Sequence, residues 1–325
     1  MKMVNGSEAF VTEFVFLGFS RQPRVQVTLF VVFLVCYLLT VSGNLIIISV
    51  VKVDPQLQTP MYFFLINLSF LDISYVSTNV PQMLVNLVTR SKTITFLGCA
   101  IQMYFSLAFG MTECFLLGVM AYDRYVAICQ PLHYRAVINW KICIQLAAFC
   151  WGSSFMSSLI INMFIIQLPF CGPNVLNHYF CEVPAVLSLA CTDTTLAEIV
   201  VFVFSIIIVF IPFLFIVVSY TYIFFAVLKI RTAQGRAKAF STCASHLTVV
   251  AIFYGTAIFM YMRPRSKSSR DRDKVIAMFY TIIMPMLNPL IYSLRNKDVK
   301  NALGRSLILL KSSAISKSPF GLVPT

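Results

Sequence analysis

The sequence predicts an all-α fold, a seven-transmembrane helix bundle with a short amphipathic C-terminal helix. Of the 325 residues, 59% are hydrophobic and only 11% are charged, which is far more apolar than an average soluble domain. Apolar runs long enough to cross a bilayer recur seven times. Short polar segments, many of them basic, separate the runs, as expected for loops at the two membrane faces.

Residues 1–24 form a polar segment ahead of the first apolar run. They lack the basic-then-apolar order of a cleaved signal peptide, so we expect the first span, residues 25–51, to direct the chain to the membrane. Asn5-Gly6-Ser7 is an N-glycosylation sequon, which matters only if this end is luminal. Gly43-Asn44 inside the first span favours close packing against a neighbouring helix.

Two acids lie inside the next two spans. The second span, residues 60–80, begins at Pro60, which suits a first helical turn. Asp72 lies in its middle, and Glu113 lies inside the third span, residues 96–128. A charged side chain at membrane depth costs on the order of 3 kcal/mol, so both acids are candidate functional residues.

The third span ends in Asp123-Arg124-Tyr125. Burying an acid and a base at a helix end is costly, so the pair either compensates itself or meets something outside the chain. An arginine that extends to the lipid headgroups is the alternative, and the triplet alone favours neither.

One face of the third span is weakly polar. Five residues follow a stripe at i, i+4 spacing: Ser106, Leu107, Gly110, Met111 and Cys114. A stripe with a glycine and small polar groups can line a cavity. Ordinary helix packing produces the same pattern, and the spacing alone favours packing.

The fourth span, residues 141–166, is followed by the long segment 167–196, and a loop of this length is usually functional or held in place. Three cysteines crowd into it, which indicates an oxidising compartment: Cys171, Cys181 and Cys191. Together with Cys99 they allow three pairings. His178 beside them raises the possibility of a metal site, which we do not favour because two disulfides would leave no thiolate.

The last three spans are expected at residues 196–229, 239–262 and 275–294. Pro212 should kink the fifth span. Pro289 should kink the seventh and free a carbonyl that Asn288 or water can satisfy. The segment 263–274 between the last two spans is expected to be a basic loop.

The chain divides into three parts: an N-terminal segment 1–24, a helical domain 25–296 and a C-terminal part 297–325. Residues 297–310 alternate basic and apolar side chains, which suits a short interfacial helix. The remaining tail is rich in Ser, Lys and Pro and is expected to be disordered.

The net charge of +13 comes largely from short loops and the tail, which indicates membrane-flanking segments rather than nucleic-acid binding. More Lys and Arg residues lie on the side of Arg124 than on the other, which predicts that this side is cytoplasmic. The basic segment 263–274 opposes that assignment. The sequon and the cysteine-rich loop support it, so we expect an extracellular N-terminus.

Five strings give the chain a specific resemblance. They are MAYDRYVAIC at 120–129, LQTPMYFFL at 57–65, KAFSTCASHL at 238–247, FYG at 253–255 and PMLNPLIY at 285–292. Together they resemble olfactory receptors of the class II, tetrapod-type branch, within the rhodopsin-like (class A) G-protein-coupled receptors. The resemblance extends over about residues 5–305, and Gln58 stands where the family usually has His.

The resemblance implies an odorant receptor that binds a small, mainly apolar volatile ligand inside the bundle. The resemblance also implies that the receptor activates a stimulatory, olfactory-type G protein, which raises cyclic AMP. Carried over by position, the ligand-binding residues are Ser106, Leu107, Gly110, Met111, Val201, Phe204, Ser205, Ile208, Ala257, Tyr261 and Thr281. No basic residue is among them, so a carboxylate ligand is not favoured.

The resemblance also implies disulfides Cys99–Cys181 and Cys171–Cys191, glycosylation at Asn5, and a plasma-membrane location in olfactory cilia. Asp72 and Glu113 suggest a sodium ion as the one possible cofactor, with a shared proton as the alternative. The residues implied in the switch and in G-protein coupling are Asp123, Arg124, Tyr125, Tyr220, Tyr254, Asn288 and Tyr292.

Two other function classes are weaker. A transporter or channel could use the intramembrane acids, but no inverted repeat and no pair of broken helices is evident in the sequence. An enzyme would need a nucleophile and a base within reach, whereas the three histidines, His133, His178 and His246, lie in separate loops or span ends.

Overall fold

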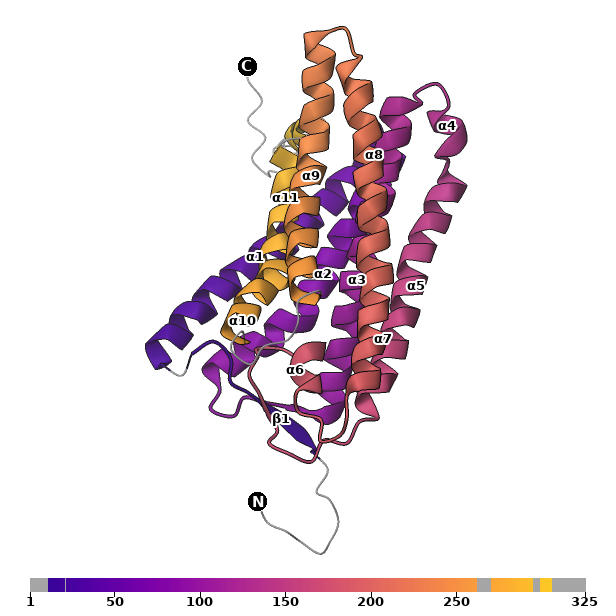
Figure 1. The fold of residues 1–325 in the computed structure, drawn as a ribbon. Helices are drawn as coiled ribbons and strands as arrows, with labels where there is room; N and C mark the ends of the chain where they lie inside the picture. The colour runs from indigo at the N-terminus through magenta and orange to yellow at the C-terminus, as the bar shows by residue number, and fades with distance from the viewer. Residues whose placement is uncertain (1–10, 21, 262–269, 295–298, 306–325) are drawn as a thin grey trace, which may run out of the picture.

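The structure, a computed structural model, describes residues 11–20, 22–261, 270–294 and 299–305. Within these ranges seven helical segments are long and apolar enough to cross a membrane, so the predicted helix bundle is confirmed. The first four are α1 (Pro23–Val53), α2 (Pro60–Val88), α3 (Phe96–Cys129) and α5 (Trp140–Ile166). They run roughly side by side along the length of the molecule (Figure 1).

The last three spans are assembled from shorter pieces. The fifth joins α7 (Thr195–Ser205), the π-helical segment η2 (Ile206–Phe210) and α8 (Ile211–Leu228). The sixth is α9 (Ala233–Tyr261). The seventh joins α10 (Arg270–Met278), a second π-helical segment, η4 (Phe279–Ile283), and α11 (Met284–Leu294).

Helix α3 forms the centre of the bundle. It packs against α2, α5 and α8. In its most apolar stretch of 18 residues 67% are buried, compared with 22% in the corresponding stretch of α1. The residues on α3 are therefore the best placed to take part in both a central cavity and the contacts between helices.

Proline affects the spans differently from expectation. Helix α2 was expected to end near Val80 but continues through Pro81 to Val88, because packed membrane helices can satisfy the backbone groups that a proline leaves unpaired. In the fifth span the π-helical segment η2 ends at Phe210, two residues before Pro212. A proline removes one backbone donor, and a π-helical turn shifts the pairing by a residue, so the helix continues.

The last span begins earlier than predicted. Residues 270–274, expected to belong to a basic loop, form the first turns of α10, while 262–269 lie outside the described residues. Lys274 is buried, and its ammonium group donates to the carbonyl of Gly18 at 2.9 Å. This lysine therefore fastens α10 to the N-terminal segment.

A small sheet covers one end of the bundle. Strand β1 (Glu13–Phe16) lies between β2 (Thr93–Thr95), which is antiparallel to it, and β3 (Val175–Leu176), which is parallel. Phe14 and Phe16 are buried beneath the sheet. We call this end, at the bottom of Figure 1, the outer end, and the opposite end the inner end. Residues 13–16 were expected to belong to the polar segment 1–24, and no strand was predicted there.

The short elements lie at the two ends. A single 3-10 turn, η1 (Pro55–Leu57), and the helix α4 (Tyr134–Val137) lie at the inner end, and α6 (Val183–Leu187) lies at the outer end. Residues 299–305 are helical. There Arg305 donates to the carboxylate of Asp54 at 3.1 Å, and this hydrogen bond holds the pKa of the Asp54 carboxyl below its ordinary value.

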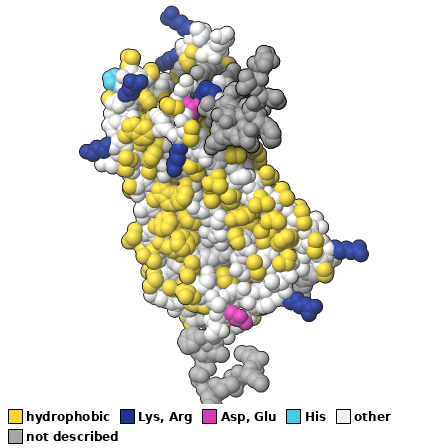
Figure 2. All heavy atoms as spheres, turned by 180° about the vertical axis from the view of Figure 1, so that it is seen from behind, with side chains coloured by type: hydrophobic (Ala, Val, Ile, Leu, Met, Phe, Trp, Pro, Cys, Tyr) yellow, Lys and Arg dark blue, Asp and Glu magenta, His cyan; other side chains and the backbone are white. Residues whose placement is uncertain are grey.

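The surface has the polarity of a membrane protein. Apolar side chains form a broad band around the middle, and Lys and Arg side chains gather toward the two ends (Figure 2). Exposed Val, Leu, Ile and Phe side chains are frequent on α1, α5, α7 and α8. A soluble monomer does not expose an apolar area of this extent, so the chain is a multi-pass membrane protein.

Candidate functional site

A cavity lies in the outer half of the bundle, between α3, the fifth span, α9 and the loop 167–194, which we call the outer loop. The space available inside it is about 80 Å³, which is smaller than a typical small-molecule site. Most of its wall is aliphatic or aromatic, with a few polar side chains. Such a wall suits a small apolar molecule that carries a limited number of polar groups.

Most of the residues predicted to bind ligand lie in the wall of this one cavity. They are Ser106, Leu107, Gly110, Met111, Val201, Phe204, Ser205, Ile208 and Ala257. Cys114, from the weakly polar stripe, joins them. The stripe on α3 therefore faces the cavity, although the spacing alone favoured packing.

Two predicted ligand-binding residues are not among the described side chains of the cavity wall. Thr281 is fully buried, but its hydroxyl lies between Tyr179 and the carbonyl of Ala277 rather than in the cavity wall. Tyr261 ends helix α9, and its side chain is not among those that the structure describes.

Gly110 leaves room on the α3 side of the cavity. A Cβ atom placed at this glycine would meet only the hydroxyl oxygen of Tyr75, at 3.9 Å. Both residues line the cavity. A larger side chain at position 110 would therefore occupy ligand space without a clash against the backbone.

The outer loop closes the cavity because it is held to α3. A disulfide joins Cys99 to Cys181, and the amide N–H of Cys181 donates to Gln102 at 2.9 Å. A second disulfide joins Cys171 to Cys191. The structure thus contains both pairings that the resemblance implied, and the first places residues 180–183 in the cavity wall.

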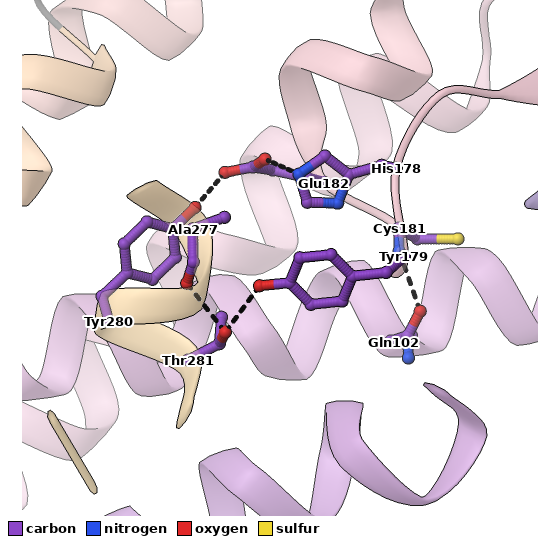
Figure 3. A network of polar contacts seen from close by, with 8 residues as sticks. All are labelled: Gln102, His178, Tyr179, Cys181, Glu182, Ala277, Tyr280 and Thr281. Carbon is purple, nitrogen blue, oxygen red and sulfur yellow. Dashed lines mark hydrogen bonds and ion pairs between the residues drawn. The ribbon is translucent and has the colours of Figure 1, made fainter. Parts of the chain in front are cut away.

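A polar cluster at the outer side of the cavity was missed (Figure 3). Glu182 is buried, lines the cavity, and accepts a hydrogen bond from the hydroxyl of Tyr280. Its other carboxylate oxygen lies 3.1 Å from Nε2 of His178. The position of Glu182 directly after a cysteine expected to be tied to α3 could have identified it.

The two intramembrane acids lie deeper, near the centre of the bundle. Asp72 is fully buried and accepts two hydrogen bonds from the Asn288 side-chain amide, each 3.1 Å long. Glu113 is also fully buried, and among the described residues neither of its carboxylate oxygens has a hydrogen-bond partner. The side-chain oxygen of Asn288 is likewise unsatisfied.

These oxygens have the chemistry that a hard cation prefers. The two carboxylates and the Asn288 oxygen therefore fit a sodium ion, with water needed to complete its shell. A proton on Glu113 would equally reduce the cost of burying a second acid. The described residues hold no cluster of three His, Cys, Asp or Glu side chains suited to a metal.

The residues predicted for the switch lie at the inner end and in the middle. Asp123 accepts a hydrogen bond from the hydroxyl of Tyr134 at 2.7 Å. Arg124 is buried, and Tyr125, next to it on α3, is half-buried. The ring of Tyr125 contacts that of Tyr222 at a centroid distance of 6.0 Å.

Tyrosine hydroxyls connect the helices at the inner end and in the middle of the bundle. Tyr220 on α8 shares a 2.8 Å hydrogen bond with Nδ1 of His246 on α9, a residue that the sequence analysis set aside. Tyr254 donates to the carbonyl of Cys114 on α3 at 2.8 Å. The hydroxyl of Tyr292 is buried without a hydrogen-bond partner among the described residues.

Comparison with known proteins gives a consistent result. The model of the olfactory receptor family matches residues 33–310. Olfactory receptor 2G3 of Homo sapiens is 53% identical over 302 residues, which cover 93% of this chain and 98% of that protein. Olfactory receptor 2B6 of Mus musculus is 51% identical over 312 residues, which cover 96% of this chain and 99% of that protein.

Proposed function

Because the chain belongs to the olfactory receptor family, and is thus an odorant receptor rather than an enzyme, we propose what it binds and how it signals. Its ligand is a small, mainly apolar volatile that occupies the cavity under the outer loop. Its effector is a stimulatory, olfactory-type G protein, which raises cyclic AMP. The observation that carries the proposal is that most of the predicted ligand residues line that single cavity.

The chemistry of the wall supports this ligand class. Met, Leu, Ile, Val and Phe side chains make up most of it, and no Lys or Arg is among the described residues that line it. Binding there is dominated by apolar burial. A carboxylate ligand would have no positive partner and would remain unfavoured.

Signalling follows from a shift between two conformations of the bundle. A ligand can activate only if it binds the active conformation more tightly than the resting one. In our scheme α9 moves away from Arg124 at the inner end, and Tyr220 and Tyr292 turn toward this arginine. The bond between Tyr220 and His246 joins α8 to α9, so it belongs to the resting conformation and breaks on activation.

The proposed orientation puts the outer end outside the cell. The disulfides of the outer loop support it, since disulfides persist in oxidising compartments. The receptor would then reside in the plasma membrane of olfactory cilia, with Asn5, which lies outside the described residues, as its glycosylation site. Asp72 and Glu113 would share a sodium ion in the resting conformation.

The experiment is a cyclic-AMP screen of cells that express the receptor, using a chemically diverse panel of volatiles. We expect the agonists to be small and mainly apolar, and we expect the response to vanish in cells that lack stimulatory α subunits. A response that persists in those cells would contradict the proposed coupling. Agonists that are mostly carboxylates would contradict the proposed ligand class.

A further inference from the structure

Three hydroxyls of the cavity wall, those of Ser106, Ser205 and Tyr280, have a common property, which is that each donates its proton inside the protein. We propose that the cavity therefore selects ligands that carry a hydrogen-bond donor, such as an alcohol or a phenol, over matched ligands that carry only an acceptor. The inference rests on the proposed function and specifies the ligand class of the same site.

The first such hydroxyl belongs to Ser106 on α3. It donates to the side-chain oxygen of Asn79 at 2.8 Å. The direction is fixed, because the Asn79 amide nitrogen donates to the carbonyl of Tyr75 at 3.1 Å and so turns its oxygen toward the serine. Ser106 has one proton, and only its lone pairs remain for a ligand.

Ser205 on the opposite wall behaves in the same way. Its hydroxyl donates to the carbonyl of Val201 at 2.7 Å. A carbonyl has no proton to give, so the serine must be the donor in this bond. Its remaining capacity toward the cavity is again that of an acceptor.

The strongest acceptor is the carboxylate of Glu182. The proton of the Tyr280 hydroxyl points to one of its oxygens, and His178 lies 3.1 Å from the other (Figure 3). Glu182 lines the cavity and is only 4% exposed, so a ligand that binds there meets the carboxylate in a desolvated setting. Hydrogen bonds to a charged acceptor in such a setting are stronger than neutral ones.

The hydroxyls behind the wall cannot return a proton to the cavity. Thr281 donates to the carbonyl of Ala277 at 2.8 Å. Its 2.8 Å contact with the Tyr179 hydroxyl must therefore use the tyrosine proton. Each proton in this network ends on a carbonyl, a carboxylate or another hydroxyl, all within the protein (Figure 3).

A ligand oxygen that can only accept meets acceptors at these positions and stays unpaired. A ligand O–H can donate to Ser106, Ser205 or Glu182. A buried polar group without a partner is penalised, and sites built around such bonds reject analogues that lack the matching group. The difference in potency should therefore appear between two molecules of the same carbon skeleton, one whose oxygen carries a hydrogen and one whose oxygen carries a methyl group.

The test uses pairs of apolar alcohols or phenols and their methyl ethers in the cyclic-AMP assay, with surface expression measured in parallel. In the unmodified receptor we expect the hydroxyl compound to have an EC50 at least about tenfold lower than its ether. Glu182→Gln introduces an amide donor, and Ser205→Ala removes an acceptor. Each should narrow that ratio to about threefold or less.

Tyr179→Phe is the matched control, since it removes a hydroxyl from the same network outside the cavity wall, and the ratio should persist. Ethers that are as potent as alcohols in the unmodified receptor would overturn the inference. So would a ratio that survives in both Glu182→Gln and Ser205→Ala. If no member of the panel acts on a receptor present at the surface, the proposed function itself fails, and the inference fails with it.

Discussion

The outer and inner ends of the bundle are held together by different kinds of contact. At the outer end two disulfides, a three-stranded sheet and the Lys274–Gly18 hydrogen bond fix the loop over the cavity. At the inner end the polar contacts between elements are single hydrogen bonds, such as Tyr220–His246 and Tyr134–Asp123, and the Arg305–Asp54 ion pair.

The difference indicates where the molecule can change shape at low cost. Covalent bridges and strand pairing keep the cavity preorganised, so less ordering is required when a ligand binds. Single hydrogen bonds contribute about 1 kcal/mol each, which a ligand can outweigh. The outer end is therefore suited to recognition and the inner end to the conformational response, with α3 connecting them.

The largest effect should come from opening the outer end. Cys99→Ser releases the outer loop from α3, and losing a native disulfide that closes an 82-residue separation costs several kcal/mol. We expect surface expression, measured by flow cytometry, to fall by about tenfold or more. Cys36→Ser, which changes a free cysteine, is the control. Normal expression and normal agonist responses of Cys99→Ser would refute the role assigned to the bridge.

At the inner end Arg124→Ala should separate folding from signalling. The side chain lies far from the cavity wall, so surface expression and ligand binding should be retained. We expect agonist-dependent cyclic AMP to be abolished, because in the proposed scheme the G protein contacts this arginine. Signalling at the level of the unmodified receptor would count heavily against the scheme.

The cavity itself can be filled without disturbing either end. Gly110→Leu places a side chain where only Tyr75 is within contact distance, so it should raise the EC50 of agonists roughly tenfold or more by excluding them. Gly152→Leu is the matched control, since this glycine is exposed on α5 with no atom near its Cβ position. Equal agonist potency in the two variants would show that the ligand binds elsewhere.

Breaking one contact at the inner end should raise signalling, whereas the variants above reduce expression or signalling, and the change should be smaller. His246→Phe removes the partner of Tyr220 and destabilises the resting conformation, so basal cyclic AMP should rise roughly two- to fivefold. Tyr220→Phe breaks the same bond but also removes a hydroxyl needed near Arg124, so it should not raise basal activity. A rise in the tyrosine variant alone would reverse our assignment.

The smallest expected effect concerns Asp54 and Arg305. The hydrogen bond from Arg305 lowers the pKa of the Asp54 carboxyl in the folded state, so the pair stabilises the protein above the unfolded-state pKa. That contribution is lost as the pH falls through the lower, folded-state value. Asp54→Asn should lower the Tm of purified receptor slightly at pH 7 and by less at pH 3. A deficit of equal size at both values would show that charge plays no part.

The helices were predicted well from the sequence because the length and polarity of an apolar run are enough to identify a membrane span. Where the prediction erred, the local signal was ambiguous. The second span was expected to cover residues 60–80, but α2 continues to Val88. Residues 270–274 were expected to be loop, although they begin α10. The strand Glu13–Phe16 could not be seen, because its partners lie about 80 and 160 residues away along the chain.

The cavity residues came from family positions rather than from spacing, since a stripe such as Ser106–Gly110 looks the same whether it packs or lines a space. Glu182, Tyr280 and His246 were missed because each acquires its role from a partner on another element. Thr281 shows the converse case. Its hydroxyl lies at a position where the family is expected to bind ligand, but it forms a hydrogen bond with a tyrosine of the outer loop instead.

The central position of β1 has a consequence for biosynthesis. Val15 pairs with Thr93 on one side and with Val175 on the other, so the segment made first must wait for a partner made about 160 residues later. In the proposed orientation the sheet is completed in the lumen only after about half of the chain has been inserted. Epitope tags for tracking newly made receptor should therefore be placed before Val11. An insertion within β1 would interfere with its pairing to β3, which is the last to form.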